Sequence, residues 1–552
     1  MPTTTASRAV TALSAPSRRL LRSTTRSHHR RTWLVLLAAL VAWFFAHHHQ
    51  ARNSTVQPRR QRAHKQDEAA PPDDELDIRT SFPPLDKLLD TDRLWPSNLD
   101  KPLCDLKIYV YNLPPELRLP DKTVKQCRWS AYNSELLLHQ LLVDPAVNPS
   151  TTSHPHDTLY TTDPADADFF LVPLFPACFL FDCWVKAGWT KTERCGVDDT
   201  YIEPVMRHVR ESHPHWNASG GADHLVVHPM DFVDGYYTEA SRAAMNASTY
   251  LVTVGDVRPA PYGSYFRSYR DLVIPSSTHL LNSYRVNPLD YVDEAGRPLV
   301  EPRGAASPHR RVDVDPPTVE MFSPSPEPVE AGLRGLVRAV ARLLRRLFGL
   351  SHVARVEART TLAIFRGGLG TATDGERYSL GIRSLFFPSD GNASTPPFSP
   401  HIHPGFSSLP GFDIAEWSDN DDYARRLARS RFGLAPPGYT LDTTRIYEYL
   451  AFGVVPVFIG SGPTAGQVMP FARDVDWSSF SLSVPRERAH ELPEILERVT
   501  DVEYERMRSK VWDVGRKVVL EGHEGNVWRL LARDLCRLKR KGVAAGSEIA
   551  NN

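Results

Sequence analysis

Candidate residues for chemistry are concentrated in one stretch of the sequence, residues 430–477. Within it, residues 436–438 predict a tight turn, and the helix expected after that turn has free N–H groups in its first turn that attract an anion. Arg445 stands at the start of this helix with five donors suited to a diphosphate. Glu448 shares its face, and a carboxylate there can accept hydrogen bonds from ribose hydroxyls. The candidates for the N-cap of this helix are the residues that directly precede Arg445, namely Asp442, Thr443 and Thr444. The alternative is an ordinary surface ion pair on a capped helix.

A second stretch, residues 364–368, ends a predicted strand with the order Arg-Gly-Gly. Glycines let a backbone approach a phosphate closely, and Arg383 downstream adds a further cation. Alone, this order fits a plain glycine turn after a strand equally well. Together, the two stretches predict a nucleotide-sugar site made of eight residues: Arg366, Gly367, Arg383, Gly438, Thr443, Thr444, Arg445 and Glu448.

The N-terminal part of the chain differs in composition from the rest. Residues 1–32 contain seven arginines and no acidic residue, and an uncharged apolar run follows at residues 33–46. Positive charge before a single apolar run predicts a cytosolic tail (1–32), a signal-anchor transmembrane helix (33–49) and a luminal remainder. A cleaved signal peptide and a transit peptide are the alternatives, because the apolar run is short for a bilayer. The charged, proline-containing residues 50–102 predict a disordered stem.

The remaining sequence predicts two α/β domains separated by an insertion, because short apolar runs alternate with helical stretches. The expected boundaries are an N-terminal domain at 103–285, a proline-rich insertion at 286–358 with an amphipathic helix at 331–350, a C-terminal domain at 359–538 and a tail at 539–552. In the first domain we expect strands at 107–111, 168–172, 224–227, 251–254 and 272–274, and a helix at 134–143. In the second we expect strands at 361–365 and 457–459, and helices at 423–430, 444–452, 492–499 and 502–520.

Charge and cysteine content narrow the class of protein. Basic and acidic residues number 65 each, so the net charge is zero and a general basic field for nucleic acid is lacking. Six cysteines permit three disulfides in a luminal protein, and the closeness of Cys178, Cys183 and Cys195 predicts a local bridge; buried free thiols are the alternative. No C-x-x-C pair occurs, so a zinc site is not expected. Four N-x-S/T acceptors predict glycosylation at Asn53, Asn217, Asn246 and Asn392.

Residues 430–477 closely resemble the signature of the exostosin family, glycosyltransferase family 47. The matching residues include Ser430, Phe432, Leu434, Pro436, Gly438, Arg445, Tyr447, Glu448, Gly453, Pro456, Val457, Pro470, Phe471, Asp476, Trp477 and, just beyond, Phe480. Upstream, residues 108–114, 167–175, 223–227, 271–275 and 362–368 are also similar to the family. Gly433 and Val454 depart from it, because members usually have cysteine at both positions.

The resemblance implies two facing Rossmann-like domains of the GT-B type, with the acceptor on the N-terminal side and the nucleotide sugar held mainly by the C-terminal domain. It implies an inverting transfer, in which a carboxylate or histidine takes the proton of the acceptor hydroxyl and cations stabilise the leaving diphosphate. The base is expected at the carboxyl end of a strand in the N-terminal half. Asp231 is the first candidate, followed by Asp168 and His279.

No cofactor is expected beyond the nucleotide sugar, which is a substrate. Residues 166–168 match a D-x-D string, and in another glycosyltransferase architecture such a string binds manganese. In the architecture implied here, protein cations replace the metal, so we predict that none is required.

Together these features predict a single-pass type II protein of the Golgi membrane, with a luminal hexosyl- or pentosyltransferase that acts on a glycan or polysaccharide. The expected partners are the nucleotide sugar, the acceptor, the membrane and other glycosyltransferases in a homo- or hetero-oligomer, and nucleic acid is not among them. One alternative is a catalytically inactive exostosin-like protein that binds glycan or scaffolds an active enzyme. Another is a cytosolic or plastid sugar transferase.

Overall fold

The structure, a computed structural model, describes the part of the chain that forms two α/β lobes. The described residues are 102–127, 130, 132–143, 159–188, 195–231, 237–258, 266–303, 355–370, 378–394, 396–397, 399–416, 420–521 and 527–540. The predicted cytosolic tail, signal-anchor helix, stem up to residue 101 and amphipathic helix 331–350 lie outside these ranges. None of the helices within them is both long and apolar enough to span a membrane.

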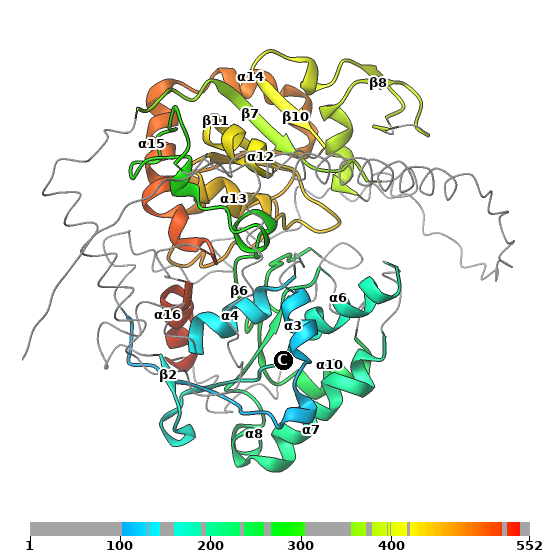
Figure 1. Cartoon of the computed structure of the whole chain (residues 1–552), viewed down its shortest axis with the longest axis vertical. Helices are drawn as coiled ribbons and strands as arrows, with labels where there is room; N and C mark the ends of the chain where they lie inside the picture. The colour runs from blue at the N-terminus through cyan, green and yellow to red at the C-terminus, as the bar shows by residue number, and fades with distance from the viewer. Residues whose placement is uncertain are drawn as a thin grey trace, which may run out of the picture. The chain divides into compact units, whose positions relative to one another are not determined.

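The N-terminal lobe contains a six-stranded parallel sheet with the strand order β2-β1-β3-β4-β5-β6 (Figure 1). Its strands are β1 (Ile108–Val110), β2 (Tyr160–Thr161), β3 (Phe169–Leu171), β4 (His224–His228), β5 (Thr249–Val252) and β6 (Leu272–Val273). Every residue of β3, β4 and β5 is buried, which explains their continuous apolar sequences, because helices cover both faces of such a sheet. The helices described around it are α3 (Asp121–Cys127), α4 (Ser134–Val143), α6 (Pro176–Lys186), α7 (Glu203–Ser212), α8 (Pro214–Ser219) and α10 (Glu239–Met245).

The C-terminal lobe contains a five-stranded parallel sheet in the order β10-β7-β11-β12-β13. Its strands are β7 (Thr361–Arg366), β10 (Phe412–Ala415), β11 (Ser430–Ala435), β12 (Val455–Ile459) and β13 (Leu482–Val484). The helices that follow in this half of the chain are α12 (Asn420–Ala428), α13 (Arg445–Ala451), α14 (Leu492–Glu497), α15 (Asp501–Asp513) and α16 (Val527–Arg540). Two lobes with parallel sheets confirm the predicted α/β, GT-B-like fold class.

Helix α13 packs closely on β11 because residue 433 has no side chain. A Cβ at Gly433 would overlap the ring of Tyr449, and the Tyr449 hydroxyl donates a hydrogen bond to Leu434 O (2.9 Å). A tyrosine from the helix therefore fills the space that the usual family cysteine would take. This contact holds α13, which begins at Arg445, against β11.

Two predicted helices of the C-terminal lobe were wrong in extent. The helix predicted at 423–430 ends at Ala428, because Ser430 begins β11, a strand that the apolar pattern did not reveal. The helix predicted at 502–520 is regular only to Asp513, and a 3-10 turn, Gly515–Val518, follows. A Cβ at Gly515 would come within 2.8 Å of Leu450, so the backbone passes too close to α13 there for most side chains.

The start of the predicted insertion contacts the fold, and its two ends pair with each other. Trp512 donates from Nε1 to Glu294 O (2.7 Å), and Leu299 forms an antiparallel bridge with Val356. The stretch between them, residues 304–354, lies outside the described residues.

Helix α16, predicted as part of the C-terminal domain, contacts both lobes. Its Trp528 donates from Nε1 to Leu138 O of α4 (2.9 Å). Its Arg533 pairs with the buried Asp474 of the C-terminal lobe (3.0 Å). Helix α16, the last described helix of the chain, therefore packs beside α4 of the N-terminal lobe.

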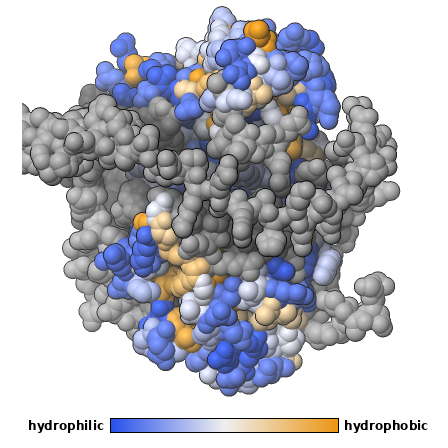
Figure 2. All heavy atoms as spheres, turned by 90° about the vertical axis from the view of Figure 1, so that its right-hand side faces the viewer, coloured by the Kyte–Doolittle hydropathy of each residue, from blue (hydrophilic) through white to orange (hydrophobic). Residues whose placement is uncertain are grey.

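Three disulfides account for the six cysteines: Cys104–Cys536, Cys127–Cys178 and Cys183–Cys195. The last confirms the predicted local bridge, whereas Cys178 pairs with a distant partner. Cys104–Cys536 ties α16 to the start of the N-terminal lobe. On the face seen in Figure 2, hydrophilic side chains cover much of the described surface, with smaller apolar areas between them.

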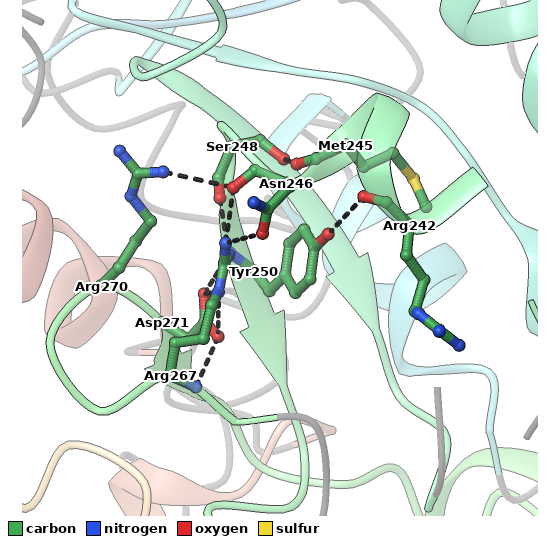
Figure 3. Close-up of polar contacts among 8 residues, drawn as sticks. All are labelled: Arg242, Met245, Asn246, Ser248, Tyr250, Arg267, Arg270 and Asp271. Atoms are coloured by element: carbon green, nitrogen blue, oxygen red, sulfur yellow. Dashed lines mark hydrogen bonds and ion pairs between the residues drawn. The ribbon is translucent and has the colours of Figure 1, made fainter. Parts of the chain in front are cut away.

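Arg267 joins the last two strands of the N-terminal sheet (Figure 3). It donates from Nη2 to Asp271 Oδ1 (2.6 Å) and to Ser248 O (2.8 Å), and from Nη1 to Asn246 O (2.5 Å). Its Cζ lies 4.1 Å from the centroid of Tyr250. The side chain of Asp271 is completely buried, so this arginine supplies the charge that its carboxylate needs.

Candidate active site

Two arginines of the C-terminal lobe lie against the same phenylalanine ring. The Cζ atoms of Arg383 and Arg445 are 5.3 and 5.1 Å from the centroid of Phe365, near the carboxyl end of β7. Among the described residues, neither guanidinium forms an ion pair with a carboxylate. We call Arg383 and Arg445 the cation pair. Burial, and next the charge of Arg445, lower the pKa of Arg383 to about 9, so Arg383 stays charged at neutral pH. A buried cation without a counter-charge favours a bound anion.

Neutral groups hold Arg383 in place. Its Nη1 donates to Gly368 O (2.8 Å) and to the Tyr378 hydroxyl (2.5 Å), and its Nη2 donates to Pro437 O (3.0 Å). Its Nε is buried and has no hydrogen-bond partner within the described ranges. These contacts orient the guanidinium without cancelling its charge, as binding of a phosphate oxygen requires.

Arg445 is positioned by two of the predicted site residues. Its Nε donates to Arg366 O, and its Nη1 donates to Thr443 Oγ1 (3.2 Å). A Cβ at Gly367 would overlap the guanidinium, so only glycine leaves room for Arg445 at that place.

The side chain of Arg366 serves the sheet instead. It is 4% exposed, and its Nη2 pairs with Asp413 Oδ1 (2.6 Å) while Nη1 donates to Asp413 O (2.8 Å). Asp413 lies on the neighbouring strand β10, so the charge of Arg366 is neutralised within the fold. Arg366 was predicted to bind phosphate through its side chain. In the structure, only its backbone carbonyl oxygen contacts the cation pair, where it accepts a hydrogen bond from Arg445.

The loop of residues 436–444 joins β11 to α13. Gly438 accepts a hydrogen bond from Ser379 N (2.7 Å) and donates to Thr440 O (3.0 Å). Thr444 occupies the N-cap position of α13, but no side-chain bond caps the helix there, so the predicted capping was wrong at that position. Helix α13 has only seven residues. The anion site therefore rests on the two guanidiniums and not on a helix terminus.

Glu448 faces the interior of the protein. It is buried, and its carboxylate accepts hydrogen bonds from the Tyr423 hydroxyl (2.9 Å) and from the Leu280 backbone N–H. Burial raises its pKa. The Glu448 carboxylate was predicted to accept hydrogen bonds from a ribose. In the structure it accepts them from groups of the protein instead.

Two carboxylates lie where the lobes meet. Asp231 follows β4, at the carboxyl end of a strand as expected, and accepts hydrogen bonds from the hydroxyls of Tyr132 (2.7 Å) and Thr440 (2.7 Å). Asp442 accepts one from Ser276 Oγ (2.5 Å). Burial raises the pKa of Asp442 to about 7, with a smaller contribution from the charge of Asp231. The candidate base thus touches the same loop that contacts the cation pair.

Asp168 lies at the other edge of the N-terminal sheet. It precedes β3, accepts a hydrogen bond from Lys107 N (3.0 Å) and pairs with Lys539 Nζ (2.5 Å). The amino end of a parallel strand is opposite the carboxyl ends, where Asp231 lies. The structure therefore does not bring Asp168 into the site, which corrects its predicted catalytic role.

His279 begins a single π-helical turn, His279–Ser283. Burial lowers its pKa, and its Nδ1 lies 3.3 Å from Ser283 Oγ. Sequence reasoning missed Asp442 as a titrating group and Tyr378 as a partner of the cation pair. The position of Asp442 between a predicted turn and a predicted helix was visible in the sequence, but Asp442 was considered only as a helix cap.

Three of the predicted glycosylation sites are described, and all three are exposed: Asn217, Asn246 and Asn392. The amide of Asn217 donates to Arg210 O (3.1 Å), and the amide oxygen of Asn246 accepts from Arg267 (3.0 Å). Asn53 lies outside the described residues. Their modification stays a prediction.

One group of potential metal ligands lies close together within the described part of the chain: Cys127, Glu135 and Cys178. The two cysteines are joined in a disulfide, and Glu135 accepts hydrogen bonds from the backbone of Ala177 and Cys178. These three potential metal ligands therefore already form a disulfide or hydrogen bonds within the protein. Metal independence of the reaction stays a prediction.

A sequence profile of the Exostosin GT47 domain matches residues 103–303 and 308–499, well over half of the chain. The chain belongs to the exostosin GT47 family. It is thus a glycosyltransferase, and the resemblance found in the sequence is confirmed.

Individual relatives of this exostosin-family chain come from plants. It is 22% identical over 405 residues to the probable glucuronosyltransferase GUT1 of Oryza sativa subsp. japonica, with 72% of each chain covered. It is 22% identical over 402 residues to the probable beta-1,4-xylosyltransferase IRX10 of Arabidopsis thaliana, again with 72% of each chain covered. Anabaena Alr3699/HepE, solved in complex with UDP-glucose, has 9% identity and a TM-score of 0.30, with 79% of this chain and all of that chain covered. That score is too low to support an argument, so the fold class rests on the two sheets.

Proposed function

We propose that this chain is an inverting glycosyltransferase of the Golgi lumen that moves a sugar from a nucleotide-sugar donor to a glycan or polysaccharide. The cation pair carries the proposal. Arg383 and Arg445 are held by neutral oxygens beside Phe365, and no carboxylate of the described residues forms an ion pair with either of them. A diphosphate supplies the missing charge and accepts charge-assisted hydrogen bonds from both guanidiniums.

The reaction uses the two lobes in different ways. The acceptor hydroxyl attacks the anomeric carbon of the donor sugar while the bond from that carbon to the diphosphate breaks. Asp231 takes the proton of the hydroxyl, and the hydroxyls of Tyr132 and Thr440 hold its carboxylate in place by hydrogen bonds. The cation pair stabilises the charge that develops on the departing diphosphate. Protein cations fill this role, so we propose that no metal is needed.

The names of the plant relatives support a glucuronosyl or xylosyl donor. The proposed location is the Golgi membrane in a single-pass type II orientation. The arginine-rich residues 1–32 ahead of the apolar run support it. Sensitivity of the expressed protein to an N-glycan endoglycosidase tests the luminal assignment, which a protein without N-glycans would contradict.

The decisive experiment uses the full chain in detergent. It screens a panel of nucleotide sugars for donor hydrolysis and transfer, and titrates nucleoside diphosphates by calorimetry. Asp231→Asn should lower transfer by about 10²–10⁴-fold, because the acceptor proton loses its base, while diphosphate affinity stays within a few-fold. Asp168→Asn is the matched control and should retain transfer.

Diphosphate binding without hydrolysis or transfer of any donor would favour the inactive, scaffolding alternative, and no diphosphate binding at all would remove the proposed donor site. A loss of transfer with EDTA that manganese restores would overturn the metal-free mechanism.

A further inference from the structure

An exposed aromatic ring lies one contact away from the cation pair. Tyr439, in the loop between β11 and α13, is 54% exposed. Its ring packs edge-on against Tyr378, with centroids 4.9 Å apart and an interplanar angle of 64°. The Tyr378 hydroxyl in turn accepts a hydrogen bond from Arg383 (2.5 Å), and its ring lies 4.7 Å from the Arg383 Cζ. The surface ring is therefore connected to the anion site through a single side chain.

The backbone behind this aromatic pair has an uncommon conformation. Ser379 and Leu380 have φ values of 57° and 53°, in the left-handed region that non-glycine residues seldom adopt. Ser379 N is tied to Gly438 O (2.7 Å), which fastens this segment to the loop that carries Tyr439. Such strain concentrates at ligand-binding sites, where the surroundings hold it in place.

Two further features describe the surroundings of Tyr378. A Cβ at Gly370 would come within 2.5 Å of the Tyr378 ring, so the ring lies directly on the backbone there. The Ser379 hydroxyl is fully buried and has no hydrogen-bond partner among the described residues. A rigid ring beneath an exposed one gives a preformed apolar surface beside polar groups, which is typical of a small-molecule site.

The residue after Tyr439 points to which ligand lies on this surface. Thr440 donates its hydroxyl to Asp231 (2.7 Å), the candidate base that must reach the acceptor hydroxyl. A sugar that presents its hydroxyl to Asp231 is therefore adjacent to Tyr439. The exposure of Tyr439 also suits a polymeric acceptor, because a polymer extends beyond the site.

We propose that Tyr439, supported by Tyr378, is a stacking platform for a sugar ring of the acceptor. This inference rests on the proposed function, because it uses the same site. The apolar C–H face of a pyranose packs on the face of an aromatic ring, whose quadrupole carries partial negative charge. The platform positions the acceptor, and Asp231 acts on its hydroxyl.

The test compares Tyr439→Ala and Tyr439→Phe in the full chain with a matched control, Tyr269→Ala. Tyr269 is also an exposed tyrosine, at 65%, but it lies beside β6, away from the cation pair. Calorimetry measures the affinity for UDP, and for xylo-, cello-, manno- and galacto-hexaose without any donor. Kinetics give the KM for the hexaose that is used, and donor hydrolysis is followed with water as the only acceptor.

Tyr439→Ala should weaken binding of the hexaose and raise its KM by about tenfold, the loss typical of one stacked ring. UDP affinity and donor hydrolysis should stay within twofold, and Tyr439→Phe and Tyr269→Ala should behave like the unmodified protein. A loss of UDP affinity in Tyr439→Ala with unchanged hexaose binding would overturn the inference, because the ring would then hold the nucleobase. Unchanged values for both ligands, or no hexaose binding by the unmodified protein, would overturn it too. Failure of the proposed function differs from both, because the unmodified protein would then neither bind UDP nor hydrolyse any donor.

Discussion

Two arginine sites in the interior of this molecule differ in whether an arginine forms an ion pair with a carboxylate. In the N-terminal lobe, Arg267 forms an ion pair with the fully buried Asp271, and it also donates to backbone carbonyls and to the amide oxygen of Asn246 (Figure 3). In the C-terminal lobe, the cation pair is hydrogen-bonded to carbonyls, one tyrosine hydroxyl and one threonine hydroxyl. Both sites also place a guanidinium near an aromatic ring.

The difference separates an arginine that maintains the fold from arginines that bind a ligand. A desolvated charge is tolerated inside a protein when an opposite charge and hydrogen bonds compensate it. Arg267 has this compensation within the chain. The cation pair forms no ion pair with a carboxylate of the described residues, and only Arg445 interacts at longer range with the charge of Glu448. A bound anion therefore lowers the free energy of the protein.

The largest effect is expected at Arg267. Arg267→Ala leaves the Asp271 carboxylate buried without its partner, which should lower the free energy of unfolding by about 3–5 kcal/mol. Urea denaturation followed by tryptophan fluorescence measures this loss. Arg267→Lys keeps the charge but loses the planar fork, so its loss should be smaller. Weaker UDP binding by the folded protein at unchanged stability would contradict the comparison, because Arg267 would then serve a ligand.

The next effect is expected at Arg445, in binding and not in stability. Arg445→Ala removes a charge-assisted partner of the diphosphate and should weaken UDP binding by about 1.5–3 kcal/mol, or one to two orders of magnitude in Kd. Its unfolding free energy should change little, because Arg383 loses a like-charged neighbour while the buried Glu448 loses a nearby opposite charge.

Arg366→Ala is the control for that variant. Arg366 is paired with Asp413, so its removal should lower stability and change the UDP affinity little. Equal losses of affinity in the two variants would show that UDP senses only the total positive charge of this lobe.

A third effect, on the pH dependence of stability, is expected from two carboxyl groups that are buried without a cation, Asp442 and Glu521. Asp442 and Glu521 each receive a hydrogen bond from the segment after β6, through Ser276 Oγ (2.5 Å) and Thr278 N (2.6 Å). Neither forms an ion pair within the described ranges. Burial is the main cause that raises their pKa values, to about 7 for Asp442 and about 8 for Glu521.

These raised pKa values fix the sign of a pH effect. Between its ordinary pKa and its folded pKa, each carboxyl keeps its proton in the folded state and loses it in the unfolded state, so stability falls as pH rises. From these two groups, thermal denaturation should give a higher Tm at pH 5.5 than at pH 8. Asp442→Asn should flatten the part of this dependence that lies below about pH 7. A slope that Asp442→Asn leaves unaltered would show that the Asp442 carboxyl does not cause it.

The sequence predicted the parallel strands well because buried strands are continuous apolar runs, such as β4 and β5. It missed β11, because the first four residues of this strand, 430–433, include a serine, an arginine and a glycine and so do not form a continuous apolar run. The same limit holds for the site. Spacing placed Arg445 correctly at the start of a helix, but it could not tell that Asp413, from another strand, neutralises Arg366. Nor could it show that Glu448 faces Tyr423, because such partners are set by tertiary packing.

The smallest effect is expected at an exposed cation, which tests whether burial underlies the comparison. Lys539 pairs with Asp168 (2.5 Å), but 43% of its side chain is exposed. Solvent screens such a pair, and holding a long side chain in one geometry costs entropy. Lys539→Ala should therefore lower the free energy of unfolding by only about 0.2–1 kcal/mol, and less still in high salt. Denaturation at two salt concentrations measures this. A loss as large as that of Arg267→Ala would mean that α16 depends on this contact, and that exposure does not distinguish structural ion pairs in this fold.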